Sequence, residues 1–116
     1  MCLLGPIGYS APERFEYTET SYQVFAYGTL KHPWVRRFIL GRSVEVTVDQ
    51  LTGYERQGLD LREDAEAVTV GVRFWVDATE MQRLDRYEQL GVRYRREEVV
   101  LASGSHAWVY RRLIVD

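Results

Sequence analysis

Hydrophobic and polar residues change their spacing several times along the chain, and each spacing predicts a different element. Residues 22–26 are rich in β-favouring side chains and are followed by Tyr27 and Gly28, which predicts a buried strand that stops at a glycine. Pro33 opens a segment of helical periodicity that Gly41 closes, so a helix is expected between them. The side chains expected to face the core from this helix are Trp34, Val35, Phe38 and Ile39.

Alternating valines dominate the middle of the chain and predict strands that bury one face. The first pattern consists of Val44, Val46 and Val48, and the clearest pattern in the sequence covers residues 68–76. Glycines punctuate residues 53–66, between the two patterns, so an irregular segment is expected there.

The C-terminal part predicts a helix and a hairpin. Asp77 and Glu80 have the spacing of a capping box, which opens a helix with Met81, Leu84 and Tyr87 facing inward. Residues 94–102 and 106–115 are expected to form strands joined by a turn at 103–105. The predicted order is β-α-β-β-α-β-β. Because two helices cannot cover both faces of a parallel sheet, the sequence predicts an α+β fold, a small mixed, mostly antiparallel β-barrel with two main helices.

Length and local composition predict how the chain is divided. The sequence has 116 residues, which is the size of one domain. Residues 1–20 contain several glycines and prolines and show no sustained period, so a flexible N-terminal arm is expected there. Residues 21–116 are expected to form the domain.

Charge and composition exclude several classes of protein. A net charge of -2 provides no general attraction to nucleic acid or to anionic membranes. No apolar run approaches the ~18 residues of a membrane-spanning helix. Cys2 is the only cysteine, which excludes an intrachain disulfide and favours a reducing, cytoplasmic location. The only histidines are His32 and His106, which lie far apart in the sequence, so a zinc site of the usual spacing is not expected.

Residues 27–30, Tyr-Gly-Thr-Leu, are the first candidate for a functional site. A glycine at the end of a buried strand lets a ligand approach the backbone, and successive N–H groups there can bind an anion. From the spacing alone, an ordinary strand-terminating turn is the simpler interpretation.

Glu88, at the C-terminal end of the second predicted helix, is the second candidate. A carboxylate at this position opposes the helix dipole, and Asp85 lies one turn earlier on the same face. Both effects raise the pKa of Glu88, and burial would raise it further, so that it could accept and return a proton near neutral pH. The alternative is a solvated glutamate paired with Arg95 or Arg96, which sequence physics alone favours.

Two weaker patterns are better explained by structure. Thr29 and His32 suggest a nucleophile and a base, but no third residue is identifiable to orient them. Residues 93–96 and 108–112 mix arginine with aromatic side chains, as surfaces that bind single-stranded nucleic acid do. Strand alternation would send these side chains to opposite faces, so solvated strand faces are expected instead.

Several segments together resemble the γ-glutamylcyclotransferase-like family, which includes the γ-glutamylamine cyclotransferase and AIG2-like branches. The resemblance covers about residues 22–112, and it is carried by the order and spacing of short motifs. These are Val24-Phe25-Ala26-Tyr27-Gly28-Thr29-Leu30, Val70-Gly71-Val72-Arg73-Phe74, Leu84-Asp85-Arg86-Tyr87-Glu88, Tyr94-Arg95-Arg96 and Ala107-Trp108-Val109-Tyr110.

The resemblance implies an enzyme that cyclises a γ-glutamyl amine or peptide to 5-oxoproline and releases the free amine. Glu88 matches the family's catalytic acid/base. The residues that match substrate-binding positions, the last two more weakly, are Tyr27, Gly28, Thr29, Leu30, Tyr110 and Tyr94. No cofactor or metal is implied, and the expected partner is a small γ-glutamyl substrate, with neither nucleic acid nor a membrane. A monomer or weak homodimer is expected.

Two departures from the family pattern leave a second hypothesis open. Gln89 stands where the family usually has a glycine, and residues 61–65 replace a Tyr-Pro segment that often shapes the pocket rim. The alternative is a non-catalytic module that uses the same fold to bind a small ligand or to interact with another protein.

Overall fold

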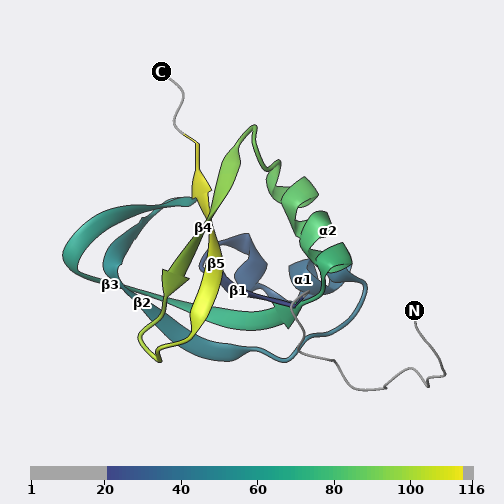
Figure 1. The fold of residues 1–116 in the computed structure, drawn as a ribbon, viewed down its shortest axis with the longest axis horizontal. Helices are drawn as coiled ribbons and strands as arrows, with labels where there is room; N and C mark the ends of the chain where they lie inside the picture. Colours follow the sequence, from purple (N-terminus) through teal and green to yellow (C-terminus); the bar gives the residue numbers. More distant parts are fainter. Residues whose placement is uncertain (1–20, 114–116) are drawn as a thin grey trace.

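A five-stranded sheet, curled into a half-barrel, forms the centre of the molecule in the computed structural model, which describes residues 21–113 (Figure 1). The strand order across the sheet is β2-β3-β1-β5-β4. The strands are β1 (Tyr22–Ala26), β2 (Thr47–Gln57), β3 (Asp60–Val76), β4 (Tyr94–Val100) and β5 (His106–Arg112). The helices are α1 (Pro33–Leu40), α2 (Ala78–Glu88) and a short 3₁₀ helix, η1 (Thr29–Lys31).

The sheet is mixed, because its central strand β1 pairs in two directions. β1 runs antiparallel to β3 and parallel to β5, and the remaining pairs, β2 with β3 and β4 with β5, are antiparallel. Both helices lie beside the sheet at the end where β3 leads into α2 (Figure 1). The predicted α+β class, the mostly antiparallel sheet and the element order are therefore confirmed.

The expectation of an irregular segment over residues 53–66 is wrong. These residues belong to the long β2–β3 hairpin, in which Tyr54 pairs with Glu63 and Gln57 with Asp60. The glycines that suggested a loop lie at two irregular points of the hairpin. At Gly53 the register of the strand pairing shifts, and Gly58 lies in the turn with a positive φ of 63°. Much of this hairpin is solvated on both faces, so its sequence lacks the alternation that predicts a strand.

Helix α1 lies at its expected position, but it turns a different face to the core. Trp34 and Phe38 are 73% and 85% exposed, whereas Val35, Arg36 and Leu40 are buried. The Arg36 guanidinium donates to the carbonyls of Leu30 (2.9 Å) and Lys31 (2.8 Å) and lies over a core phenylalanine ring. An arginine can replace an apolar residue here because its stem packs in the core while its head satisfies carbonyl groups that would otherwise be unpaired.

Helix α2 begins with the predicted capping box. The Asp77 carboxylate accepts from the Glu80 N–H at 2.7 Å, and the Glu80 carboxylate accepts from the Asp77 N–H at 3.0 Å. Met81 and Leu84 are buried as expected, whereas Tyr87 is 43% exposed. The first turn of α2 is therefore fixed by its own sequence.

Alternation along β1 divides the core into two clusters. Val24 and Ala26 pack with the helices in one cluster, and Phe25 and Tyr27 pack in the other with β5 residues such as Val109. The expected arm, residues 1–20, lies outside the described residues. Among the described residues, no helix is long and apolar enough to cross a membrane.

Candidate active site

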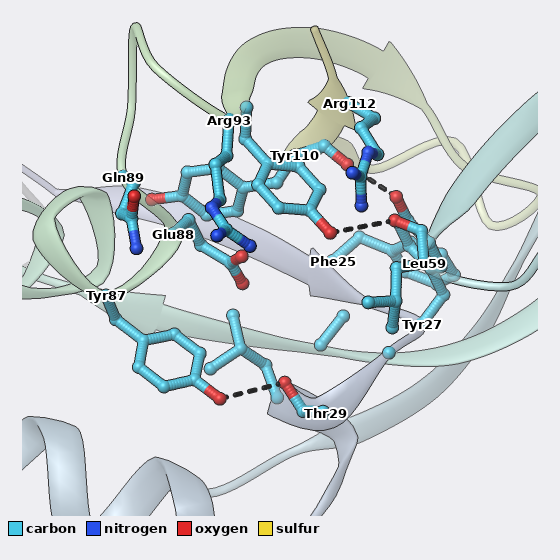
Figure 2. A pocket seen from close by; sticks show the side chains of 14 residues that line it. Phe25, Tyr27, Thr29, Leu59, Tyr87, Glu88, Gln89, Arg93, Tyr110 and Arg112 are labelled. Carbon is cyan, nitrogen blue, oxygen red and sulfur yellow. Dashed lines mark hydrogen bonds between the residues drawn. The ribbon is translucent and has the colours of Figure 1, made fainter.

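A cavity of about 300 Å³ opens at the end of β1, where the chain leaves the sheet and enters η1 (Figure 2). It brings together, from four separate parts of the chain, all seven residues to which the family resemblance assigns a catalytic or substrate-binding role. The lining residues are Phe25, Ala26, Tyr27, Gly28, Thr29, Leu30, Leu59, Tyr87, Glu88, Gln89, Arg93, Tyr94, Tyr110 and Arg112.

Glu88 is the last residue of α2, and among the residues that the structure describes it is the only carboxylate that lines this cavity. Within residues 21–113 its carboxylate has no hydrogen-bond or ion-pair partner. Burial raises the pKa of Glu88 from its ordinary value of 4.5 to about 7. Arg95 and Arg96, the expected partners in the solvated alternative, pair with Glu97 and Asp85 instead. The ion-paired interpretation of Glu88 is therefore wrong.

The physical cause of the raised pKa differs in part from the one expected. Asp85 does not act on Glu88, because its carboxylate accepts from the Tyr110 hydroxyl at 2.7 Å and pairs with the Arg96 guanidinium at 3.0 Å. Desolvation of the Glu88 carboxylate in the cavity wall raises its pKa. Asp85 instead ties the C-terminal part of α2 to β4 and β5.

The loop of residues 27–30 offers polar backbone groups to the cavity. Gly28 has open space where a side chain would start, since a Cβ there would meet no atom within 4 Å. Among the described residues, the N–H groups of Gly28, Thr29 and Leu30 donate to no protein acceptor. The Thr29 and Tyr87 hydroxyls are hydrogen-bonded at 3.1 Å, linking this loop to α2 (Figure 2).

Three buried tyrosines form much of the cavity's inner wall. Tyr27 donates to the Tyr110 carbonyl at 2.5 Å, and Tyr94 donates to the Leu59 carbonyl at 3.1 Å. Burial raises the pKa of Tyr27, Tyr94 and Tyr110, so all three are neutral hydrogen-bond donors near pH 7. The hydroxyl groups of Tyr27, Tyr94 and Tyr110 therefore hold the wall together.

The residues missed from the sequence come from the rim. Leu59, in the β2–β3 turn, reaches the cavity because the hairpin is longer than expected. The departure noted at residues 61–65 does not affect the lining, since none of these residues contributes to it. Arg93 and Arg112 also line the cavity. In the sequence they belong to the two segments that mix arginine with aromatic residues, and those segments were expected to be solvated strand faces.

Gln89 ends α2 in a left-handed conformation, with φ 56° and ψ 56°. Among residues 21–113 it is the only non-glycine with a positive φ. A glycine adopts this conformation without the steric cost of a Cβ, which explains why a glycine at this position suits the fold. The Gln89 side chain lines the cavity, so the departure from the family pattern changes the site itself.

The fold and the cavity define a class of small α+β proteins in which a half-barrel surrounds a pocket lined by a half-buried carboxylate. A family model described as "Gamma-glutamyl cyclotransferase, AIG2-like" matches residues 24–113. The protein belongs to this family, as its sequence motifs indicated. A search of curated proteins gave no significant match.

Solved structures with the same fold are distant in sequence. The chain is similar to an Arabidopsis thaliana protein studied in solution, with a TM-score of 0.69 and 23% identity over 84% of this chain and 72% of that one. It is also similar to a γ-glutamyl cyclotransferase, with a TM-score of 0.70 and 14% identity over 83% and 69% of the two chains. A Pyrococcus horikoshii protein is similar as well, with a TM-score of 0.62 and 21% identity over 78% of this chain and 77% of that one.

Proposed function

We propose that this protein is a γ-glutamyl cyclotransferase that converts a γ-glutamyl amine or peptide into 5-oxoproline and a free amine, with Glu88 as the general acid/base. The observation that carries this proposal is the Glu88 carboxylate, which lines the same cavity as the 27–30 loop, has no partner within the described chain, and has a pKa of about 7. Membership in the family supports the same reaction class.

The reaction is intramolecular and consumes no water. Glu88 takes a proton from the α-ammonium group of the γ-glutamyl moiety, and the freed nitrogen attacks the γ-carbonyl carbon. The bond between this carbon and the leaving nitrogen then breaks. In all, two protons move from the attacking nitrogen to the leaving nitrogen, and Glu88 relays them, so that the products are a lactam and an ammonium ion.

Two features of the site suit the transition state of this reaction. The unpaired N–H groups of residues 28–30 can donate to the oxygen that becomes negative when the carbonyl is attacked. The buried wall of Tyr27, Tyr94 and Tyr110 keeps water from the reacting atoms, which strengthens those hydrogen bonds.

The test is incubation with γ-glutamyl amines, γ-glutamyl dipeptides and glutathione, followed by mass detection of 5-oxoproline. Glu88→Gln is expected to lower turnover by ~10²–10⁴-fold, because an amide cannot relay a proton. Glu45→Gln, an exposed carboxylate before β2, is the control and should retain activity. For the wild type, kcat/KM should rise with pH and level off above about 7.

A fully active Glu88→Gln variant would rule out the mechanism. If the wild type releases 5-oxoproline from none of these compounds, the non-catalytic ligand-binding module becomes the better interpretation.

A further inference from the structure

A single carboxylate, that of Asp85, joins three elements beside the cavity. Its Oδ1 atom accepts from the Tyr110 hydroxyl at 2.7 Å and lies 3.0 Å from Nε of Arg96. The Arg96 guanidinium also lies over the Trp108 ring, 5.3 Å from the ring centroid. Asp85 belongs to α2, Arg96 to β4, and the two aromatic residues to β5, so the C-terminal part of the helix is held to both strands at this point.

The contact between Asp85 and Arg96 depends on charge more than on hydrogen-bond geometry. The Nε atom of Arg96 is buried and makes no hydrogen bond within the described chain, although it lies within ion-pair distance of Asp85. A buried N–H group without an acceptor costs free energy. Arg96 would therefore pair with a second carboxylate within its reach if Asp85 lost its charge.

Glu88 is that second carboxylate. It follows Asp85 by three residues on α2, and residues three apart are neighbours on a helix surface. Both carboxylates and the Arg96 cation act on the Tyr110 hydroxyl. Burial raises the pKa of Tyr110, as do the hydrogen bond to Asp85 and the charge of Glu88, whereas the charge of Arg96 lowers it. Arg96 thus has two carboxylates on one turn of helix beside it and pairs with the first.

Titratable groups face Glu88 from every element around the cavity, and Arg96 is not one of them (Figure 2). Burial raises the pKa of Glu88 to about 7, whereas a guanidinium paired with it would lower the pKa. The tyrosines of the lining are neutral near pH 7, and the arginines come from the α2–β4 connection and the end of β5. These titratable residues of the lining are Tyr27, Tyr87, Tyr94, Tyr110, Arg93 and Arg112.

We propose that Asp85 is a positioning residue of the candidate active site: it keeps the Arg96 guanidinium outside the cavity and so leaves the Glu88 carboxylate without a cation. This role rests on the proposed cyclotransferase function, in which Glu88 moves the protons. Asp85 does not line the cavity, so it acts on Glu88 only through Arg96. An unpaired Glu88 can accept a proton from a bound substrate, whereas a carboxylate held by a guanidinium is a weaker base.

Asp85→Asn is the central test. The amide oxygen can still accept from the Tyr110 hydroxyl, but the negative charge is gone. Arg96 is then expected to pair with Glu88 and to lower its pKa by about one pH unit or more, which is the range for an opposite charge within ~4–6 Å. Carbon-13 NMR titration of the Glu88 side-chain carboxyl, assigned with Glu88→Gln, measures this pKa. The rise of kcat/KM with pH should move to lower pH by the same amount.

The double variant Asp85→Asn with Arg96→Gln isolates the effect of the cation. Repulsion between the two carboxylates is lost in the single and the double variant alike, but only the double variant also lacks the guanidinium. The pKa of Glu88 is therefore expected to return to the wild-type value of about 7. Arg96→Gln alone should leave this pKa unchanged.

Glu55→Gln is the matched control. Glu55 pairs with Arg62 at 2.7 Å on the exposed β2–β3 hairpin, and neither residue lines the cavity. Removal of this carboxylate from its arginine should change neither the pKa of Glu88 nor the pH profile of activity. Thermal unfolding verifies that each variant is folded.

Three results would overturn the proposal. An unchanged pKa of Glu88 in folded Asp85→Asn would leave Asp85 with a structural role only. A lowered pKa that persists in the double variant would mean that lost repulsion, and not Arg96, is the cause. If Asp85→Asn does not fold, Glu88 has not taken up the released cation, which contradicts the proposal as well.

Failure of the proposed function is distinguishable from failure of this positioning role, because the NMR titration needs no substrate. If the wild type forms no 5-oxoproline, a pKa of Glu88 that falls in Asp85→Asn and recovers in the double variant still supports the role of Asp85. If the wild type is active and the pKa does not move, the cyclotransferase function stands and the positioning role fails.

Discussion

Glu88 is the residue whose charge state links stability to function. Its pKa is about 7 in the folded protein and near 4.5 when the side chain is solvated, so the fold favours the neutral acid. The stability that comes from this preference is complete below about pH 4.5 and is lost as the pH rises through about 7. The ionised form needed to accept a proton is therefore the form that the fold disfavours.

Glu88→Gln should reveal this conflict in the free energy of unfolding. The variant stays neutral at every pH, so its stability relative to the wild type is expected to increase by about 1–2 kcal/mol between pH 4.5 and pH 8, allowing for screening by water. Urea unfolding at the two pH values measures the difference, with Glu45→Gln as the control. A relative stability that does not change with pH would contradict burial as the cause of the raised pKa.

Gln89 provides a second test at the residue scale. Because its left-handed conformation disfavours any residue with a Cβ, Gln89→Gly is expected to raise the free energy of unfolding by about 1 kcal/mol. Gln82→Gly, an exposed position inside the same helix, should instead lower it by about 1 kcal/mol. Denaturant unfolding of both variants checks the opposite signs. Destabilisation by Gln89→Gly would mean that contacts of its side chain outweigh the backbone cost.

Among the elements, the packing of β3 against β1 depends on one glycine. A Cβ at Gly71 would lie 2.7 Å from Cζ of Phe25 and would clash with the Ala26 carbonyl oxygen. The carbonyl belongs to the strand that leads into the 27–30 loop, so it cannot move without disturbing the site. A glycine is therefore needed at this position of the family motif because any side chain would clash with β1.

Gly71→Ala is expected to lower the free energy of unfolding by about 1–3 kcal/mol or more, since the close contact forces the two strands apart. Thermal or denaturant unfolding measures the loss. Val70→Ala, at the adjacent half-exposed position, is the control and should change stability by less than about 0.5 kcal/mol. A Gly71→Ala variant as stable as the wild type would show that β1 and β3 can separate without cost.

For the molecule as a whole, residues 21–113 contain the five-stranded sheet and both α-helices. The central strand starts at Tyr22, and the family model starts at Val24. Deletion of residues 1–20 is therefore expected to leave Tm nearly unchanged, which a thermal melt of the shortened chain measures. A large fall in Tm would assign a structural role to this segment.

Local signals in the sequence determined most of the elements. The Asp77 capping box and the stop at Gly41 each act within a few neighbouring residues, and the structure confirms both. The alternation over residues 68–76 predicted the strand correctly but only part of its buried face, since Phe74 and Val76 are buried whereas Val68 and Val70 are half-exposed. The motif order around Gly28 and Glu88 was likewise sufficient to identify the family. These features are readable because their physical causes, hydrogen bonds of caps and turns and the period of side-chain directions, are local.

Tertiary structure decided which surfaces and charges meet. Which face of α1 is buried depends on carbonyl groups near Leu30, which accept hydrogen bonds from Arg36. The β2–β3 hairpin is largely exposed to solvent, so its sequence shows no apolar alternation. The pKa of Glu88 follows from desolvation in a cavity, and the ion pair of Asp85 with Arg96 joins residues of α2 and β4 that lie apart in the sequence. Burial and charge compensation are sums over residues distant in the sequence, so only the folded chain determines them.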